Sequence, residues 1–267
     1  MSDRVPNAPT PNPQAPSPIP QPLTPNPPRI PRADGRTPDQ LRPISLEPRY
    51  LELHPASCLA RFGRTWVLCT ASVEERVPPF LEGRGRGWVT GVYGMMPGSV
   101  ADRIAPARNS GGRAEEISRL IGRSLRAAVN LGSLGVRTIT IDCQVVQADG
   151  GTRTAAVTGG YVALALALRD LKTRGLLAAA ETAHQVAAIS VGLVDDQALL
   201  DLAQEEDSRA DADLNVVMTD GEAFVEVQGT AEGQAFARAQ LEALLDLAQG
   251  AIRELLAEQR RALAGHE

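Results

Sequence analysis

The stretch Gln147–Thr158, which reads QADGGTRTAAVT, decides how the rest of the chain is interpreted. It is preceded by Thr138–Val146, a run of β-branched and apolar residues that predicts a buried strand. It leads into Ala155–Leu171, which is dense in alanine, leucine and valine, contains no proline and predicts a buried helix. The sequence therefore places a glycine-rich turn between a strand and the first turn of a helix.

Such a turn is suited to binding an anion. The first N–H groups of a helix lack partners within the helix, and the helix dipole is positive at that end. Arg153 lies in the expected first helical turn, where the dipole disfavours a cation unless a negative ligand lies nearby. Two interpretations stay open: an anion site that includes Arg153, or an ordinary turn capped by Asp149 with Arg153 in solvent.

A second helix begins in the same way. Gly111 and Gly112 precede Arg113, and an apolar stripe predicts a helix over Arg113–Leu131. If the fold brings Arg113 and Arg153 together, two guanidinium groups and free amides form a clamp for phosphate. A basic stripe on another face of this helix is interpreted as a solvated or interface surface; it consists of Arg119, Arg123 and Arg126.

The first 35 residues do not belong to a core. Twelve of the 20 prolines lie before residue 32, and large apolar residues are almost absent there. This composition predicts a disordered, proline-rich extension over residues 1–35, followed by one catalytic domain over 36–263. No apolar segment follows Met1, and no run of about 18 apolar residues occurs, so the sequence predicts neither a signal peptide nor a membrane span.

The three cysteines, at positions 58, 69 and 143, lie in apolar strand-like contexts without metal-ligand spacing. They indicate reduced core residues of a cytoplasmic protein. The net charge of −5 argues against non-specific coating of nucleic acid. Charge is nevertheless uneven, because residues 61–126 carry 11 arginines and 6 acidic residues, whereas residues 195–267 carry 5 arginines and 17 acidic residues. One interpretation is that the basic part faces a polyanion and the acidic part holds a metal ion. The other is that both parts are ordinary solvated surfaces.

Within the acidic part, Glu205–Asp213 carries carboxylates dense enough to repel one another unless water or a cation screens them. Asp207 and Asp213 flank a loop at the mouth of an expected strand, an arrangement that suits Mg²⁺ held by one or two carboxylates and a phosphate. An acidic surface turn is the alternative. Further strands, hairpins and a long C-terminal helix are expected at 57–62, 65–73, 88–93, 185–194, 197–203, 213–219, 223–228 and 234–263.

Several motifs, occurring in order from about Arg36 to about Ala262, resemble the ribonuclease PH family. They are LCTASVEE at 68–75, GWVT at 87–90, YGM at 93–95, GGR at 111–113, RLIGR at 119–123, QADGGTRT at 147–154, DLNVVM at 213–218 and EVQGTAEG at 226–233. The resemblance implies an α/β (α+β) fold of βαβ type, shared with polynucleotide phosphorylase and exosome core subunits. It also implies a ring-shaped homohexamer built as a trimer of dimers.

The resemblance further implies phosphorolysis. Inorganic phosphate attacks the 3′-terminal phosphodiester of RNA, chiefly of tRNA precursors and also of rRNA, and a nucleoside 5′-diphosphate is released in a reversible reaction. Phosphate-binding roles carry over to Arg113, Gly151, Thr152 and Arg153. Catalytic roles, and the binding of Mg²⁺ or Mn²⁺, carry over to Asp207 and Asp213. RNA-binding roles fall on Arg103 and Arg108, in a loop that departs from the family at Gly98, where the family has arginine.

Two rival functions are weighed against this one. A catalytically silent RNA-binding ring subunit is disfavoured because both arginines and both aspartates are present. A hydrolytic metal-dependent nuclease would require a denser set of carboxylates and no clamp for a phosphate ion.

Overall fold

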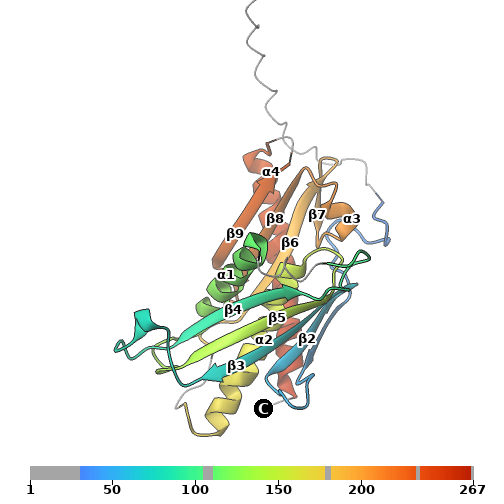
Figure 1. Ribbon diagram of the computed structural model, residues 1–267. Coiled ribbons are helices and arrows are strands. Elements are labelled where there is room, and N and C mark those ends of the chain that lie inside the picture. Colours follow the sequence, from blue (N-terminus) through green and yellow to red (C-terminus); the bar gives the residue numbers. More distant parts are fainter. Residues whose placement is uncertain (1–30, 105–110, 178–181, 233–234, 266–267) are drawn as a thin grey trace, which may run out of the picture.

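The two halves of the chain form two different sheets (Figure 1). The computed structural model describes residues 31–104, 111–177, 182–232 and 235–265. The first sheet has the strand order β1-β2-β3-β5-β4. Its strands are β1 Ile44–Pro48, β2 Ser57–Phe62, β3 Thr65–Glu74, β4 Trp88–Met95 and β5 Thr138–Gln147. The expected hairpin at 57–73 is confirmed, and Gly63, with a φ of 55°, makes its turn.

Strand β4 runs parallel to β5, and α1 (Gly112–Ala127) connects them, which gives the expected βαβ unit. Helix α1 ends four residues before the expected Leu131. Asn130 explains the difference, because its side-chain oxygen accepts hydrogen bonds from the N–H groups of Gly132 and Ser133 and closes a turn there.

The second sheet is antiparallel and has the order β7-β6-β8-β9. Its strands are β6 Val186–Val194, β7 Gln197–Leu200, β8 Ala212–Thr219 and β9 Phe224–Ala231. The short helix α3 (Gln204–Asp207) connects β7 to β8, so strand β7 is shorter than the expected 197–203. A 3₁₀ turn, η1 (Pro79–Leu81), precedes β4.

Helix α2 (Thr152–Thr173) packs against strands of both sheets, and most of its residues, including every one from Thr154 to Leu168, are buried. The expected buried helix is therefore confirmed. Close approach to β2 and β3 depends on Gly159, because a Cβ added there would lie 2.6 Å from the Cβ of Ala60. Helix α4 (Arg238–Ala264) packs on β6, β7 and β1. Buried apolar residues from both sheets form one large core, and a small separate cluster consists of Val194, Leu199 and Leu202. The expected start of this helix at residue 234 is wrong, because the described residues 235–237 are not helical and Ala237 is the N-cap; residue 234 itself lies outside the described residues.

The three cysteines are free and buried, as expected, and burial raises the pKa of the Cys58 thiol to about 12. None of the helices in the described part of the chain is long and apolar enough to cross a membrane.

The proposed end of the N-terminal extension at residue 35 is wrong by a few residues. Arg32 is buried, and its guanidinium forms two hydrogen bonds of 2.7 Å with the carboxylate of Glu206. The folded part of the chain therefore includes Arg32, and residues 1–30 lie outside the described residues.

Candidate active site

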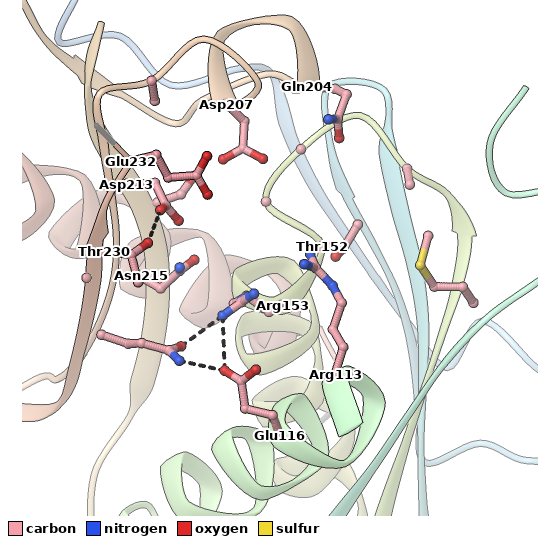
Figure 2. A pocket seen from close by; sticks show the side chains of 18 of the residues that line it. Arg113, Glu116, Thr152, Arg153, Gln204, Asp207, Asp213, Asn215, Thr230 and Glu232 are labelled. Carbon is pink, nitrogen blue, oxygen red and sulfur yellow. Dashed lines mark hydrogen bonds and ion pairs between the residues drawn. The ribbon is translucent and has the colours of Figure 1, made fainter. Parts of the chain in front are cut away.

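A cleft of about 330 Å³ lies where the two sheets meet, at the N-terminal ends of α1 and α2. Both helices that begin with a glycine pair and an arginine therefore open into the same cleft (Figure 2). The residues expected to bind phosphate and the two aspartates all line it: Arg113, Gly151, Thr152, Arg153, Asp207 and Asp213.

The turn before α2 has an unusual backbone. Gly150 and Gly151 have φ values of 76° and 64°, which lie in the left-handed region that favours glycine. Gly151 is the N-cap of α2, and no side chain of the described chain caps this helix end. The alternative in which Asp149 caps the helix is therefore wrong. The amides at the start of α2 are left to face a ligand or solvent.

The two arginines are held differently. Arg153 donates a 2.8 Å hydrogen bond to the side-chain oxygen of Gln228 and lies 3.5 Å from the carboxylate of Glu116. Gln228 also donates a hydrogen bond to Glu116, so each of the three side chains contacts the other two. By contrast, Arg113 has no hydrogen bond or ion pair with any residue that the structure describes, and it projects toward Thr152 (Figure 2).

Thr152 has a fixed hydroxyl. Its Oγ1 lies 2.8 Å from the phenol oxygen of Tyr93 on β4. Tyr93 is buried, and burial raises the pKa of its phenol. This contact links the start of α2 to the first sheet.

The carboxylates lie on the opposite side of the cleft. Figure 2 shows Asp207, Asp213 and Glu232 there, across from Arg113 and Arg153. Thr230 donates a 2.7 Å hydrogen bond to Asp213. Burial, and then repulsion from Asp213, raises the pKa of Asp207, although the two arginines act in the opposite direction. Cations that could bind an attacking anion thus face acids that could serve a leaving group.

The structure describes only one of the two residues expected to bind RNA. Arg103 is exposed and does not line the cleft, whereas Met95 and Val100 from the same segment do. Arg108 lies outside the described residues. The basic stripe of α1 is partly engaged, since Arg126 stacks over the ring of Trp88 and Arg123 lies 3.3 Å from Glu226.

Sequence reasoning assigned no role to several cleft residues. Gln228 lies within the EVQGTAEG motif, but only the structure shows that it binds Arg153. Ser190 is an ordinary strand serine in sequence, yet its hydroxyl is buried beside the cleft and has no partner among the described residues. No sequence signal could have identified Ser190.

Comparison with known proteins defines the class first. Two adjacent family models match the chain, both described as 3′ exoribonuclease family: domain 1 over residues 40–169 and domain 2 over residues 184–251. The chain belongs to the 3′ exoribonuclease family.

One individual relative is a ribonuclease PH of Synechococcus sp. (strain JA-2-3B'a(2-13)). It is 52% identical over 236 residues, which cover 87% of this chain and 97% of the relative. Among solved structures, an Archaeoglobus fulgidus exosome with RNA bound to its active site matches with a TM-score of 0.71 and 21% identity, covering 85% of this chain and 92% of the other. An archaeal exosome core matches with a TM-score of 0.69 and 20% identity, covering 86% and 91%. These two structures establish the likeness of the fold.

Proposed function

We propose that this protein is a phosphate-dependent 3′→5′ exoribonuclease that shortens the 3′ ends of tRNA precursors and other RNA, including rRNA. Inorganic phosphate is the second substrate, nucleoside 5′-diphosphates are the products, and the reverse reaction adds nucleotides. The observation that carries the proposal is the two-sided cleft, in which Arg113, Arg153 and the start of α2 face Asp207 and Asp213.

The basic side binds the nucleophile. Orthophosphate and the scissile phosphodiester are both anions, so their approach costs Coulomb energy that grows as water is excluded. Arg113 and Arg153 offset this repulsion, and the amides of Gly151 and Thr152 orient the phosphate oxygens. Phosphate is already ionised at neutral pH, so positioning and charge neutralisation are the main tasks of the protein here.

The acidic side serves the leaving group. Asp207 and Asp213 fit a Mg²⁺ or Mn²⁺ site, because such ions commonly use one or two protein carboxylates and complete their shell with water and phosphate oxygens. The described residues contain no group of three or more side chains placed to hold a metal ion. The site proposed here is therefore one in which two carboxylates bind the cation and water and phosphate supply its other ligands. A bound cation would supply charge neutralisation at the phosphate oxygens. General acid catalysis is the alternative role: with no cation bound to it, Asp207 has a raised pKa that suits a carboxyl group donating a proton to the departing 3′ oxygen.

Assembly and RNA binding extend the proposal. We infer a homohexamer arranged as a trimer of dimers, acting in the cytoplasm. Apolar side chains exposed on one chain are consistent with burial between subunits; they include Val92, Met96, Phe224 and Val227. We assign the RNA contacts to Arg103 and Arg108, which lie in the chain between the cleft residues Val100 and Arg113.

A single assay tests the proposed function. The purified protein is incubated with a 3′-extended tRNA precursor, with and without inorganic phosphate, and the mononucleotide products are identified. We expect shortening only when phosphate is present and nucleoside 5′-diphosphates as products. Monophosphates formed without phosphate would indicate hydrolysis, and RNA binding without shortening would indicate a silent subunit.

A further inference from the structure

The glycine turn that forms the phosphate side of the cleft is held from behind by two buried side chains. Arg42 donates through Nη1 to the carbonyl oxygen of Asp149 at 2.5 Å. Thr65 donates through its hydroxyl to the carbonyl oxygen of Gly150 at 2.6 Å, and the same hydroxyl accepts from the N–H of Asp149 at 2.9 Å. Neither Arg42 nor Thr65 lines the cleft.

These bonds set the direction of the amides. In a planar trans peptide the carbonyl oxygen and the following N–H point in opposite directions. Because Arg42 holds the carbonyl of Asp149 on the buried side, the N–H of Gly150 is turned away from that side. Because Thr65 holds the carbonyl of Gly150, the N–H of Gly151 is turned away as well, and both glycines line the cleft.

Arg42 is itself rigidly held. Its guanidinium forms a two-pronged pair with Asp201, at 3.0 Å from Nε and 2.6 Å from Nη2, and Asp201 has a side-chain exposure of 0%. The remaining nitrogen, Nη1, is the one that reaches Asp149. The packing is tight, since a Cβ added to Gly151 would lie 3.0 Å from Nη2 of Arg42, and one added to Gly150 would lie 2.5 Å from the carbonyl oxygen of Leu202.

We propose that Thr65 and Arg42 are positioning residues, which fix the Asp149–Gly151 turn so that its amides are preorganised for inorganic phosphate without touching the phosphate themselves. The inference rests on the proposed function, because it assumes that phosphate binds at this turn. Preorganised donors lose little free energy to rearrangement when the anion arrives. Loss of either tether should therefore weaken phosphate binding more than RNA binding.

The test uses a conservative series at Thr65 in the full chain. Thr65→Val keeps the shape but removes the hydroxyl, and Thr65→Ser keeps the hydroxyl. Thr138→Val is the matched control, because Thr138 has a nearly buried side chain at the far end of the same sheet and its hydroxyl also donates to a carbonyl, that of Arg76, at 2.7 Å. For each variant the turnover number and the Michaelis constants for phosphate and for RNA are measured, together with thermal unfolding to confirm folding.

We expect Thr65→Val to raise the Michaelis constant for phosphate about ten-fold, in line with the loss of a buried hydrogen bond, with that for RNA nearly unchanged. Thr65→Ser should restore the constant to near the wild-type value, and Thr138→Val should leave it unchanged. Arg42→Lys provides a second route, since one ammonium cannot hold Asp201 in two places and also reach Asp149, and it should show the same selective loss.

The positioning role is overturned if Thr65→Val and Arg42→Lys keep the wild-type Michaelis constant for phosphate, or change both constants equally. It is also overturned if Thr65→Ser behaves like Thr65→Val. Failure of the proposed function gives a different result, because the wild-type protein would then shorten RNA independently of phosphate or would not shorten it at all.

Discussion

Arg153 and Arg113 face the same cleft but differ in how firmly they are held. Arg153 is fixed by Gln228 and Glu116 before any ligand arrives, whereas Arg113 has no such partner among the described residues. A fixed guanidinium loses less side-chain entropy on binding an anion than one that must be ordered. Arg153 should therefore contribute strongly to phosphate affinity.

The first prediction concerns Arg153→Ala. Loss of one charge-assisted contact to an anion costs about 1.5–3 kcal/mol, so we expect the Michaelis constant for phosphate to rise roughly ten- to hundred-fold and that for RNA to change much less. Arg119→Ala is the control, because Arg119 is exposed on α1 and pairs only loosely, at 3.8 Å, with Glu115. Unchanged phosphate dependence in Arg153→Ala would contradict the assignment of the clamp.

The second prediction concerns Asp213→Asn. If Asp213 acts on the transition state, turnover should fall while the Michaelis constant for phosphate stays nearly constant. Nucleotide addition from diphosphates should be lost in parallel, because both directions pass through one transition state. Asn215, which follows on β8 and also lines the cleft, provides a comparison through Asn215→Ala. Separate losses of the two directions would argue against this role.

The third prediction follows from the raised pKa of Asp207. Burial and the neighbouring Asp213 make the folded protein bind this proton more tightly than the unfolded chain does. The free energy of unfolding contributed by Asp207 is therefore greatest below the unfolded pKa and falls as the pH rises through the raised value. We expect Asp207→Asn to be more stable than the wild type at neutral pH, with the difference shrinking in acid.

Denaturant unfolding of metal-free, phosphate-free protein between about pH 4 and about pH 7 measures this effect. Asp211→Asn is the control, because Asp211 is a carboxylate in the same segment that does not line the cleft. A neutral-pH stability of Asp207→Asn below that of the wild type would show that the carboxylate is not destabilised in the cleft.

At the scale of elements, the segment before β1 is held against α3 and the end of β7 by three arginines, Arg32, Arg36 and Arg42, which we call the brace. Arg32 binds Glu206, which is the immediate neighbour of Asp207, and Arg36 lies 3.7 Å from the buried carboxylate of Asp201. Asp201 in turn holds Arg42. The brace thus joins α3, next to Asp207 on the carboxylate side of the cleft, to the Asp149–Gly151 turn on the opposite side.

The fourth prediction compares two truncations. Removing residues 1–30 should leave turnover and assembly unchanged, because that composition cannot form a core. Removing residues 1–35 also removes Arg32 and leaves Glu206 partly unpaired, which we expect to cost about 3 kcal/mol and to lower the melting temperature. Equal melting temperatures for the two truncated proteins would show that the Arg32 pair is dispensable.

At the scale of the whole molecule, the net charge of −5 is the sum over a basic part, residues 61–126, an acidic part, residues 195–267, and the rest of the chain. The fifth prediction is that light scattering finds a particle of six chains, with exposed apolar residues such as Phe224 buried between subunits. A fully active monomer would contradict the ring.

RNA affinity should fall as salt rises, because loop arginines such as Arg103 contact RNA phosphates. An affinity that does not depend on salt would contradict these contacts with the RNA backbone.

The amino-acid sequence by itself determined the local elements and the residue types of the cleft. Periodicity and β-branching identify β5 and α2, and a glycine pair shortly before an arginine identifies the two helix starts proposed to bind an anion, because these signals depend on neighbours in the chain. The motifs that resemble ribonuclease PH led to Asp207 and Asp213 in the same way.

Tertiary structure alone decided which of these residues meet. The contact of Arg153 with Gln228 spans 75 positions, and that of Arg42 with Asp201 spans 159. Separations of this length leave no local periodic trace, so sequence reasoning missed the role of Gln228, placed Arg32 in the extension and overlooked the support of the turn by Thr65. The direction of the Gly150 and Gly151 amides depends on side chains that approach from behind, and only packing of distant strands brings those side chains there.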